Sequence, residues 1–287
     1  MRYRRLALLS GIAITAGLAV ITLFGNMATR ATPSVVGPLA ATEQEITLRT
    51  IDGVKIAASY FPVASSEAPV ILMLHGNGAS RNQFKGHAAW LNNAGYAAMA
   101  IDFRGHGESQ EEAKSFGLFE ARDAEAAVAW IKKDSPKAKI GVIGVSLGGA
   151  ASLLGKDGPL PVDALILKAV YPDIDRAIRN RVATRVGSFA AAIITPLLTY
   201  QSPFRYGAWP GNISPVNGTS KFPGPVLVIG GAKDSYTPAD ESKLLFDGFP
   251  GPGQLWIVDG LEHDQISDLG NDVYRQRVLW FLKGALK

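Results

Sequence analysis

The most specific signal in the sequence is Gly144-Val145-Ser146-Leu147-Gly148-Gly149, between an apolar strand predicted over 139–145 and a helix predicted over 147–154. A serine at such a strand-to-helix turn takes a strained conformation that lifts its hydroxyl above the sheet, and the glycines on either side leave room for it. The same turn directs the backbone amide of Leu147 at the reacting centre. We therefore interpret Ser146 as a nucleophile and not as part of an ordinary glycine-rich turn.

A serine hydroxyl needs an adjacent base, for which histidine is the usual choice. The chain contains four histidines, at His75, His87, His106 and His263. Where a serine stands between a strand and a helix in this way, the acid and then the base follow it along the chain, on loops after later strands. Only His263 follows Ser146, a short loop after an apolar strand over 254–258. His263 is therefore the predicted base.

The acid that orients His263 is predicted to be Asp234, which directly follows an apolar strand over 225–230. A carboxylate at this place can bond the second imidazole nitrogen and fix the tautomer of the ring. Asp259 and Asp264 are the alternatives. Each is so close to His263 in sequence that it would need an unusual loop to face the ring.

A second backbone donor for the oxyanion is predicted in the loop His75-Gly76-Asn77-Gly78, which follows a short apolar strand. A His-Gly stretch at this place is the expected device. The amide of Asn77 is our choice, and Gly76 or Gly78 takes its place if the loop is shifted by one residue. The side chain of His75 is expected to hold the loop and not to react.

Short apolar strands alternate with helical stretches through most of the chain, as is typical of a parallel sheet covered by helices. A hairpin opens the pattern, because two alternating runs over 46–50 and 54–61 join through Asp52-Gly53. Further strands are predicted over 70–74, 96–101, 139–145, 164–170, 225–230 and 254–258. Helices are predicted near 84–93 and over 120–133, 147–154, 242–249 and 273–286. The prediction is a mostly parallel sheet of eight strands with helices on both faces.

Residues 171–224 are too long for an ordinary connection in such a sheet and are predicted to form an inserted helical cap. Apolar side chains recur every four residues in its first part, at Ile174, Ile178, Val182 and Val186. Arginines occupy other sides of this helix, and residues 189–198 are nearly all apolar. Two interpretations stay open. The cap rests on lipid, or its apolar residues roof an acyl pocket while the arginines are solvated.

The N-terminus carries Arg2, Arg4 and Arg5 before an apolar run over 6–24, so residues 1–29 are either a signal anchor or a cleaved signal peptide. The run has about the length needed to cross a bilayer, and the residues after it make a poor cleavage site. We favour a single-pass anchor with the catalytic domain outside the cytosol. Secretion or periplasmic release after cleavage is the alternative. Residues 30–42 are predicted to be a flexible tether, and residues 43–287 the folded domain.

The composition suits one large domain and excludes several functions. The net charge of +4 comes from four arginines that flank the N-terminal segment, so the rest is near neutral and nucleic-acid binding has no electrostatic support. Cysteine is absent from the 287 residues, which excludes disulfides and thiolate chemistry. The scattered histidines predict no metal site, and the glycine-rich loop lacks the Lys-Ser/Thr of a phosphate-binding loop. The expected partners are a small-molecule ester or acyl substrate and a membrane, with no cofactor.

The motifs resemble those of the α/β-hydrolase superfamily. The resemblance rests on 74–78, on Asp102-Phe103-Arg104-Gly105-His106-Gly107-Glu108-Ser109, on 144–148 and on the later Asp234 and His263, and it covers most of the chain from residue 46. Residues 102–109 are similar to those of monoacylglycerol-lipase-like and serine-aminopeptidase-like members, and the layout resembles membrane-anchored hydrolases of the BEM46 type. The resemblance implies an α/β-hydrolase fold, a cofactor-free esterase, lipase or peptidase, and a structural role for His106.

Three functions compete at this point. The first is a carboxylic-ester hydrolase that forms an acyl-enzyme on Ser146, with His263 and Asp234 as base and acid. A serine peptidase is the second, but it would usually need a carboxylate for the substrate amine or a separate propeller domain, and the sequence marks neither. The third is a non-catalytic binding protein on a hydrolase fold. A missing member of the triad would favour it, and none is missing.

Overall fold

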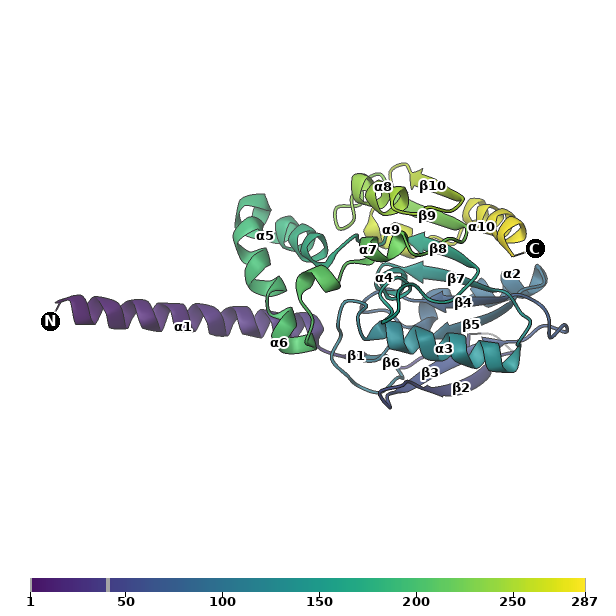
Figure 1. Ribbon diagram of the computed structural model, residues 1–287, viewed down its shortest axis with the longest axis horizontal. Coiled ribbons are helices and arrows are strands. Elements are labelled where there is room, and N and C mark those ends of the chain that lie inside the picture. Colours follow the sequence, from purple (N-terminus) through teal and green to yellow (C-terminus); the bar gives the residue numbers. More distant parts are fainter. Residues whose placement is uncertain (1, 40–41, 287) are drawn as a thin grey trace.

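The central feature of the protein is one twisted sheet, whose strands lie one below another in Figure 1, from β10 at the top to β2 at the bottom. The computed structural model describes residues 2–39 and 42–286, with the backbone alone for residues 2–14 and 18. The sheet has eight strands in the order β10-β9-β8-β7-β4-β5-β3-β2. Their bounds are β2 (Gln44–Arg49), β3 (Lys55–Phe61), β4 (Val70–Leu74), β5 (Ala97–Ile101), β7 (Ile140–Val145), β8 (Ala164–Lys168), β9 (Val226–Gly231) and β10 (Gly253–Val258).

Six neighbouring strands, from β10 to β5, are parallel, and β3 is antiparallel to both of its neighbours, β5 and β2. The central strands are buried along their whole length, which is why they read as continuous apolar runs and not as alternating ones. The predicted α/β-hydrolase fold is therefore confirmed, and the antiparallel hairpin joins it at one edge.

Helices cover both faces of the sheet and enclose two separate cores. One core packs β4 residues Val70 and Leu72 against α3 and α4, and the other packs the intervening Ile71 and Met73 against α2 and α10. This division follows from the alternation of side chains along a strand. The helices are α2 (His87–Asn93), α3 (Glu120–Asp134), α4 (Leu147–Ala151), α8 (Ala239–Asp247), α9 (His263–Ser267) and α10 (Asp272–Ala285), with a 3-10 turn η1 (Arg81–Phe84) before α2.

The predicted cap region between β8 and β9 is mostly helical. It contains α5 (Ile174–Thr199), α6 (Ser202–Tyr206), η2 (Pro210–Asn212) and α7 (Pro215–Thr219). Helix α5 is interrupted at Gly187, whose φ of 81° and ψ of 162° are not helical. This break separates the two parts that the sequence distinguished. Figure 1 shows α5 and α6 standing away from the sheet, on the side from which α1 leaves the domain.

The N-terminal segment forms a single helix, α1 (Arg2–Thr29). Arg2, Arg4 and Arg5 are expected to set the orientation of this helix in a membrane, and their side chains lie outside the described part of the structure. The next residues differ from the expected flexible tether, because β1 (Thr32–Pro33) pairs in parallel with β6 (His106–Gly107), and Val36 and Leu39 are buried. Composition alone did not reveal that this segment could add backbone hydrogen bonds to the loop at 106–107. Residues 40 and 41, also in the predicted tether, lie outside the described residues.

Candidate active site

Ser146 lies between the end of β7 and the start of α4 with φ of 46° and ψ of −105°. This backbone conformation is strained for any residue with a Cβ, and it is the one expected where a serine is lifted out of a strand-to-helix turn. The neighbouring glycines are required by contact. A Cβ on Gly148 would overlap the carbonyl of Leu74, and a Cβ on Gly144 would lie 2.7 Å from the Cα of Gly149.

Asp234 is buried on the loop that follows β9 and is bonded through both carboxylate oxygens. Its Oδ2 lies 2.8 Å from Nδ1 of His263, and its Oδ1 accepts the backbone amides of Tyr236 and Thr237, each at 2.8 Å. A carboxylate held by two amides has little freedom to turn. It therefore fixes the orientation of the imidazole and leaves Nε2 as the free ring nitrogen.

His263 is the first residue of α9, a short helix that the sequence patterns did not predict. A capping box between Glu262 and Gln265 fixes the start of this helix. The ring of Tyr236 packs on the imidazole with 5.3 Å between ring centroids. The Glu-x-x-Gln spacing was visible in the sequence and could have indicated the helix start.

The two alternative acids do not hold the histidine. Asp259 and Asp264 are exposed, and the Nδ1 of His263 is bonded to Asp234. Asp264 is the next residue along α9, and adjacent helical residues do not face each other. The structure thus brings together the base and the acid that the sequence paired.

The two backbone amides expected to bind an oxyanion lie on adjoining segments. The amide of Leu147 belongs to the first turn of α4, where amides have no partner within the helix. The loop that carries Gly76 and Asn77 runs beside the serine turn, since a Cβ on Gly76 would lie 3.6 Å from the Cγ1 of Val145. Asn77 itself is exposed. The arrangement places both segments at the same edge of the sheet.

His75 and His106 support this edge and are both buried. His75 bonds the carbonyl of Gly76 through Nδ1 at 2.7 Å and accepts the amide of Phe103 through Nε2 at 3.0 Å. Burial lowers the pKa of His75 to about 3, so the ring is neutral near pH 7. Burial also lowers the pKa of His106, whose Nδ1 lies 3.0 Å from the carbonyl of Arg104. His75 thus joins the ends of β4 and β5, and His106 Nε2 lies 3.4 Å from Oδ1 of Asn77 in the loop after β4.

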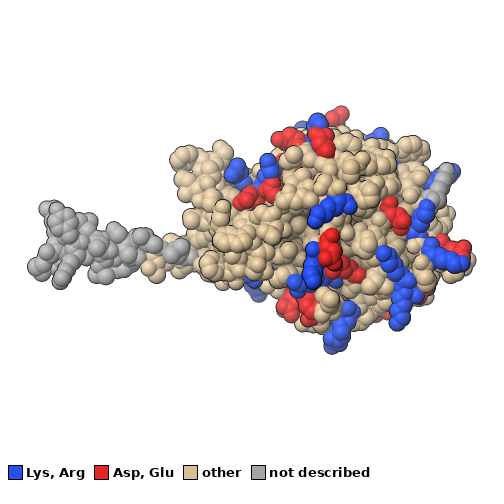
Figure 2. All heavy atoms as spheres, viewed as in Figure 1, with Lys and Arg blue, Asp and Glu red and all other residues tan. Residues whose placement is uncertain are grey.

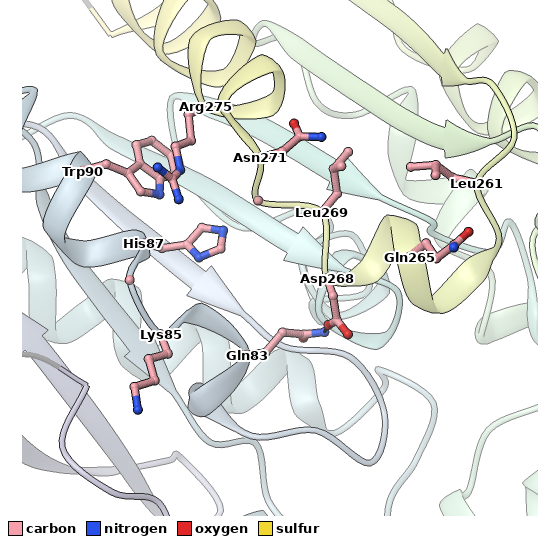
Figure 3. A pocket seen from close by; sticks show the side chains of 12 residues that line it. Gln83, Lys85, His87, Trp90, Leu261, Gln265, Asp268, Leu269, Asn271 and Arg275 are labelled. Carbon is pink, nitrogen blue, oxygen red and sulfur yellow. Dashed lines mark hydrogen bonds between the residues drawn. The ribbon is translucent and has the colours of Figure 1, made fainter.

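Gln83 links the loop after β4 to the segment after His263, and sequence reasoning missed it. Its Oε1 accepts the amide of Gly76 at 2.9 Å, and its Nε2 donates to Asp268 at 3.0 Å. Figure 3 shows Gln83 and Asp268 joined across one end of a cavity of about 490 Å³. The cavity lies behind the loop that carries His263 and is not lined by Ser146. A lone glutamine in a polar loop gives no signal of such a role.

The cap reaches this site through Arg181 on α5. Its guanidinium lies 5.0 Å from the centre of the Tyr236 ring, the same ring that packs on His263. Next to it, the amide of Asn180 donates to the carbonyl of Tyr236 at 3.1 Å. The first half of α5 is therefore tied to the loop that holds Asp234.

Ser146, Asp234 and His263 follow three strands of one parallel sheet, β7, β9 and β10. The carboxyl ends of parallel strands meet at one edge, where α/β proteins generally bind ligands. A strained serine, a histidine with a bonded carboxylate and the two segments that carry the expected oxyanion amides therefore share this edge. Such a set can carry out nucleophilic acyl transfer.

Comparisons with known proteins agree with this architecture. Residues 65–204 match the family described as serine aminopeptidase, S33. An uncharacterised protein of Mycobacterium tuberculosis is 27% identical over 242 residues, which cover 83% of this chain and 79% of that protein. The lysophosphatidylserine lipase ABHD12 of Xenopus tropicalis is 33% identical over 121 residues, 40% of this chain and 31% of that protein.

Solved structures show the same fold. The esterase Pf2001 of Pyrococcus furiosus superposes with a TM-score of 0.70 at 21% identity, over 90% of this chain and 100% of that chain. Its likeness concerns the fold, since the identity is low. With the sheet order, the serine turn and the family match pointing the same way, this chain belongs to the α/β-hydrolase superfamily.

Proposed function

We propose that this protein is a serine esterase or lipase that cleaves carboxylic esters through an acyl-enzyme on Ser146. The single observation that carries the proposal is the 2.8 Å bond between His263 and the buried Asp234, at the edge of the sheet where Ser146 is held with φ of 46°. Nucleophile, base and acid follow one another in the chain order of this fold. The esterases among its structural neighbours add support.

The reaction takes two steps. In the first, Ser146 Oγ bonds to the ester carbonyl carbon, His263 Nε2 takes the hydroxyl proton, and the C–O bond breaks as the alcohol leaves with that proton. In the second, water gives a proton to His263 and attacks the carbonyl carbon of the acyl-enzyme; the Oγ–C bond breaks, the acid leaves, and His263 returns the proton to Ser146 Oγ. The amides of Leu147 and Asn77 stabilise the negative oxygen in both steps. The carboxylate of Asp234 stabilises the imidazolium that forms in each.

Labelling with a fluorophosphonate probe tests the nucleophile. We expect the full-length protein to be labelled and the Ser146→Ala variant to be unreactive. Ser152→Ala is a matched control, because this buried serine ends the same helix and its hydroxyl bonds the carbonyl of Gly149 at 2.7 Å. Equal labelling of Ser146→Ala would refute the proposal.

A serine peptidase is the second candidate, and the match to the serine aminopeptidase family favours it. The chemistry on Ser146 would be the same, with an amine as leaving group. Turnover of p-nitrophenyl esters is to be compared with that of aminoacyl p-nitroanilides. We expect the esters to be cleaved and the anilides to be left intact. The opposite preference would assign the site to peptide bonds.

We also propose that α1 anchors the chain in a membrane, with the catalytic domain outside the cytosol. The length of α1, 28 residues, and its apolar sequence support this. The chain lacks cysteine, so a single cysteine in place of Ile51, which is 91% exposed in the turn between β2 and β3, gives one reporter. Spheroplasts should react with a membrane-impermeant maleimide without lysis. Reaction only after lysis would place the domain inside.

A further inference from the structure

A helix of a water-soluble protein buries its large apolar side chains. The later part of α5 and the start of α6 show the opposite pattern. From the end of α5 into α6, large apolar side chains repeat every three or four residues and are exposed. They are Val186, Phe189, Ile193, Leu197, Tyr200 and Phe204. Small residues set about 200° around the helix are buried instead. They are Ala191, Thr195, Thr199 and Ser202.

The exposure of this apolar face is extreme. Phe189 is 84% exposed and Phe204 is 93% exposed. Residues that roofed an acyl pocket would be covered by the domain beneath them. The described protein does not cover this face in that way, and an exposed apolar patch of this kind marks an interaction surface.

The same helices are fastened to the last turns of α1. Gln201 Nε2 donates to the carbonyl of Ile21 at 3.2 Å, and Arg205 donates to the carbonyl of Thr22 at 3.1 Å and to Asn26 Oδ1 at 2.8 Å. Gly25 permits this approach, because a Cβ there would overlap the side chains of Gln201 and Arg205. We name these contacts of Gly25, Gln201 and Arg205 the clasp.

The clasp places the apolar face beside the helix expected to enter the membrane. Figure 1 shows α5 and α6 on the side of the domain from which α1 projects, and Figure 2 shows this end mostly free of charged side chains, with most lysines, arginines and carboxylates over the remaining surface. Side chains of α1 near the clasp continue the apolar surface, at Val20, Leu23, Phe24 and Met27.

Among the described residues, the stretch Ile174–Tyr206 also has the length and the apolar composition needed to cross a membrane. However, the helix is broken at Gly187, and the small residues along one side of it are buried. A helix that spans a membrane would have neither feature. Both suit a helix pair that lies in the interface, with one face in lipid and the other on protein.

We infer that the exposed face of the cap rests in the lipid bilayer that α1 enters, and that the clasp fixes the cap in this position. The inference rests on the proposed anchor. It specifies the substrate further, since a site whose cap lies in lipid takes acyl esters that reside in the membrane.

Spin labels on single cysteines test the inference in the full chain, reconstituted at one copy per nanodisc so that a second copy cannot cover the face. The positions are Phe189 and Phe204 on the cap, Val20 on α1 and Ile51 as the aqueous control, which is 91% exposed. Oxygen concentrates in lipid and a nickel chelate stays in water, so their relative effects on each label report its depth. We expect Phe189 and Phe204 to match Val20 and to differ from Ile51.

The outcomes separate the inference from the proposal beneath it. If Val20 is in lipid while Phe189 and Phe204 behave like Ile51, the anchor stands and the inference is wrong. If Val20 is also aqueous, both are wrong. Gly25→Leu should return the labels at Phe189 and Phe204 to aqueous values, because its side chain breaks the clasp. Gly17→Leu is the matched control, with no atom within 4 Å of its Cβ, and should change nothing. Unchanged labels in Gly25→Leu would overturn the role of the clasp.

Discussion

His263 Nδ1 lies 2.8 Å from Oδ2 of Asp234, 29 residues earlier in the chain, and the other carboxylate oxygen is held by two backbone amides. The orientation of the imidazole is therefore set by a carboxylate on the loop after β9. This relationship determines what substitutions at the acid should do.

Asp234→Asn should reduce kcat on the order of 10³–10⁴-fold while the fold is retained, because an amide favours the wrong imidazole tautomer. Steady-state hydrolysis of a soluble p-nitrophenyl ester measures it. Asp264→Asn is the control and should stay within twofold, since that carboxylate is exposed next to His263 on α9. A larger loss in Asp264→Asn would show that the acid is misassigned.

Gln83→Ala should reduce kcat about tenfold with little change in KM, because the amide of Gly76 loses its acceptor and the oxyanion loop loses its position. The loss of an oxyanion donor itself typically costs 10²–10³-fold, so a positioning effect is smaller. Lys85→Ala, on the wall of the same cavity, is the control. A KM effect alone in Gln83→Ala would contradict a role in positioning the oxyanion loop.

His87→Leu should weaken the acid sensitivity of stability. Burial lowers the pKa of His87 to about 3, so between pH 6.5 and pH 3 the unfolded state binds a proton that the folded state refuses, and stability falls as pH falls. From pH 7 to pH 5 this single group costs about 2 kcal/mol. Denaturant unfolding at both pH values should show a smaller loss in the variant. Equal losses would mean that His87 does not remain neutral.

Gly148→Ala should destabilise the protein by roughly 3 kcal/mol, because a Cβ at this position overlaps the carbonyl of Leu74. Gly284→Ala tests the opposite case in α10, where no atom lies within 4 Å of the new Cβ. There alanine should stabilise by about 0.5–1 kcal/mol through helix propensity. Unfolding midpoints of the two variants give the comparison, and equal midpoints would contradict the steric argument at Gly148.

Serine in place of Phe189, Ile193 and Leu197 together should spare soluble short-chain esters within twofold and slow the hydrolysis of vesicle-borne esters on the order of tenfold. These side chains would then serve contact with lipid and not the acyl pocket. Val273 and Trp280 are also exposed, on α10, and their change to serine is the control. A shift in chain-length preference with soluble esters would instead support the roof interpretation.

The sequence by itself determined the features that depend on local geometry. A glycine-flanked serine between a strand and a helix is typical of one kind of turn, and buried parallel strands have continuous apolar runs, so the turn at Ser146 and the sheet could both be predicted from short stretches of sequence. Asp234 and His263 followed from the order of strands, because loops after parallel strands meet at one edge.

Only the tertiary structure decided which groups complete that edge and where the cap faces. Gln83 and Arg181 act through contacts between segments far apart in the chain, and no periodicity encodes such a contact. The pairing of residues 32–33 with the loop at 106–107 also went unseen, since two-residue strands carry no pattern. The apolar stretch of α5 left both a pocket roof and a lipid-facing surface open in sequence. Burial of its small side against the protein, with the large side exposed, is a property of packing alone, and it is the observation that supports the lipid-facing interpretation.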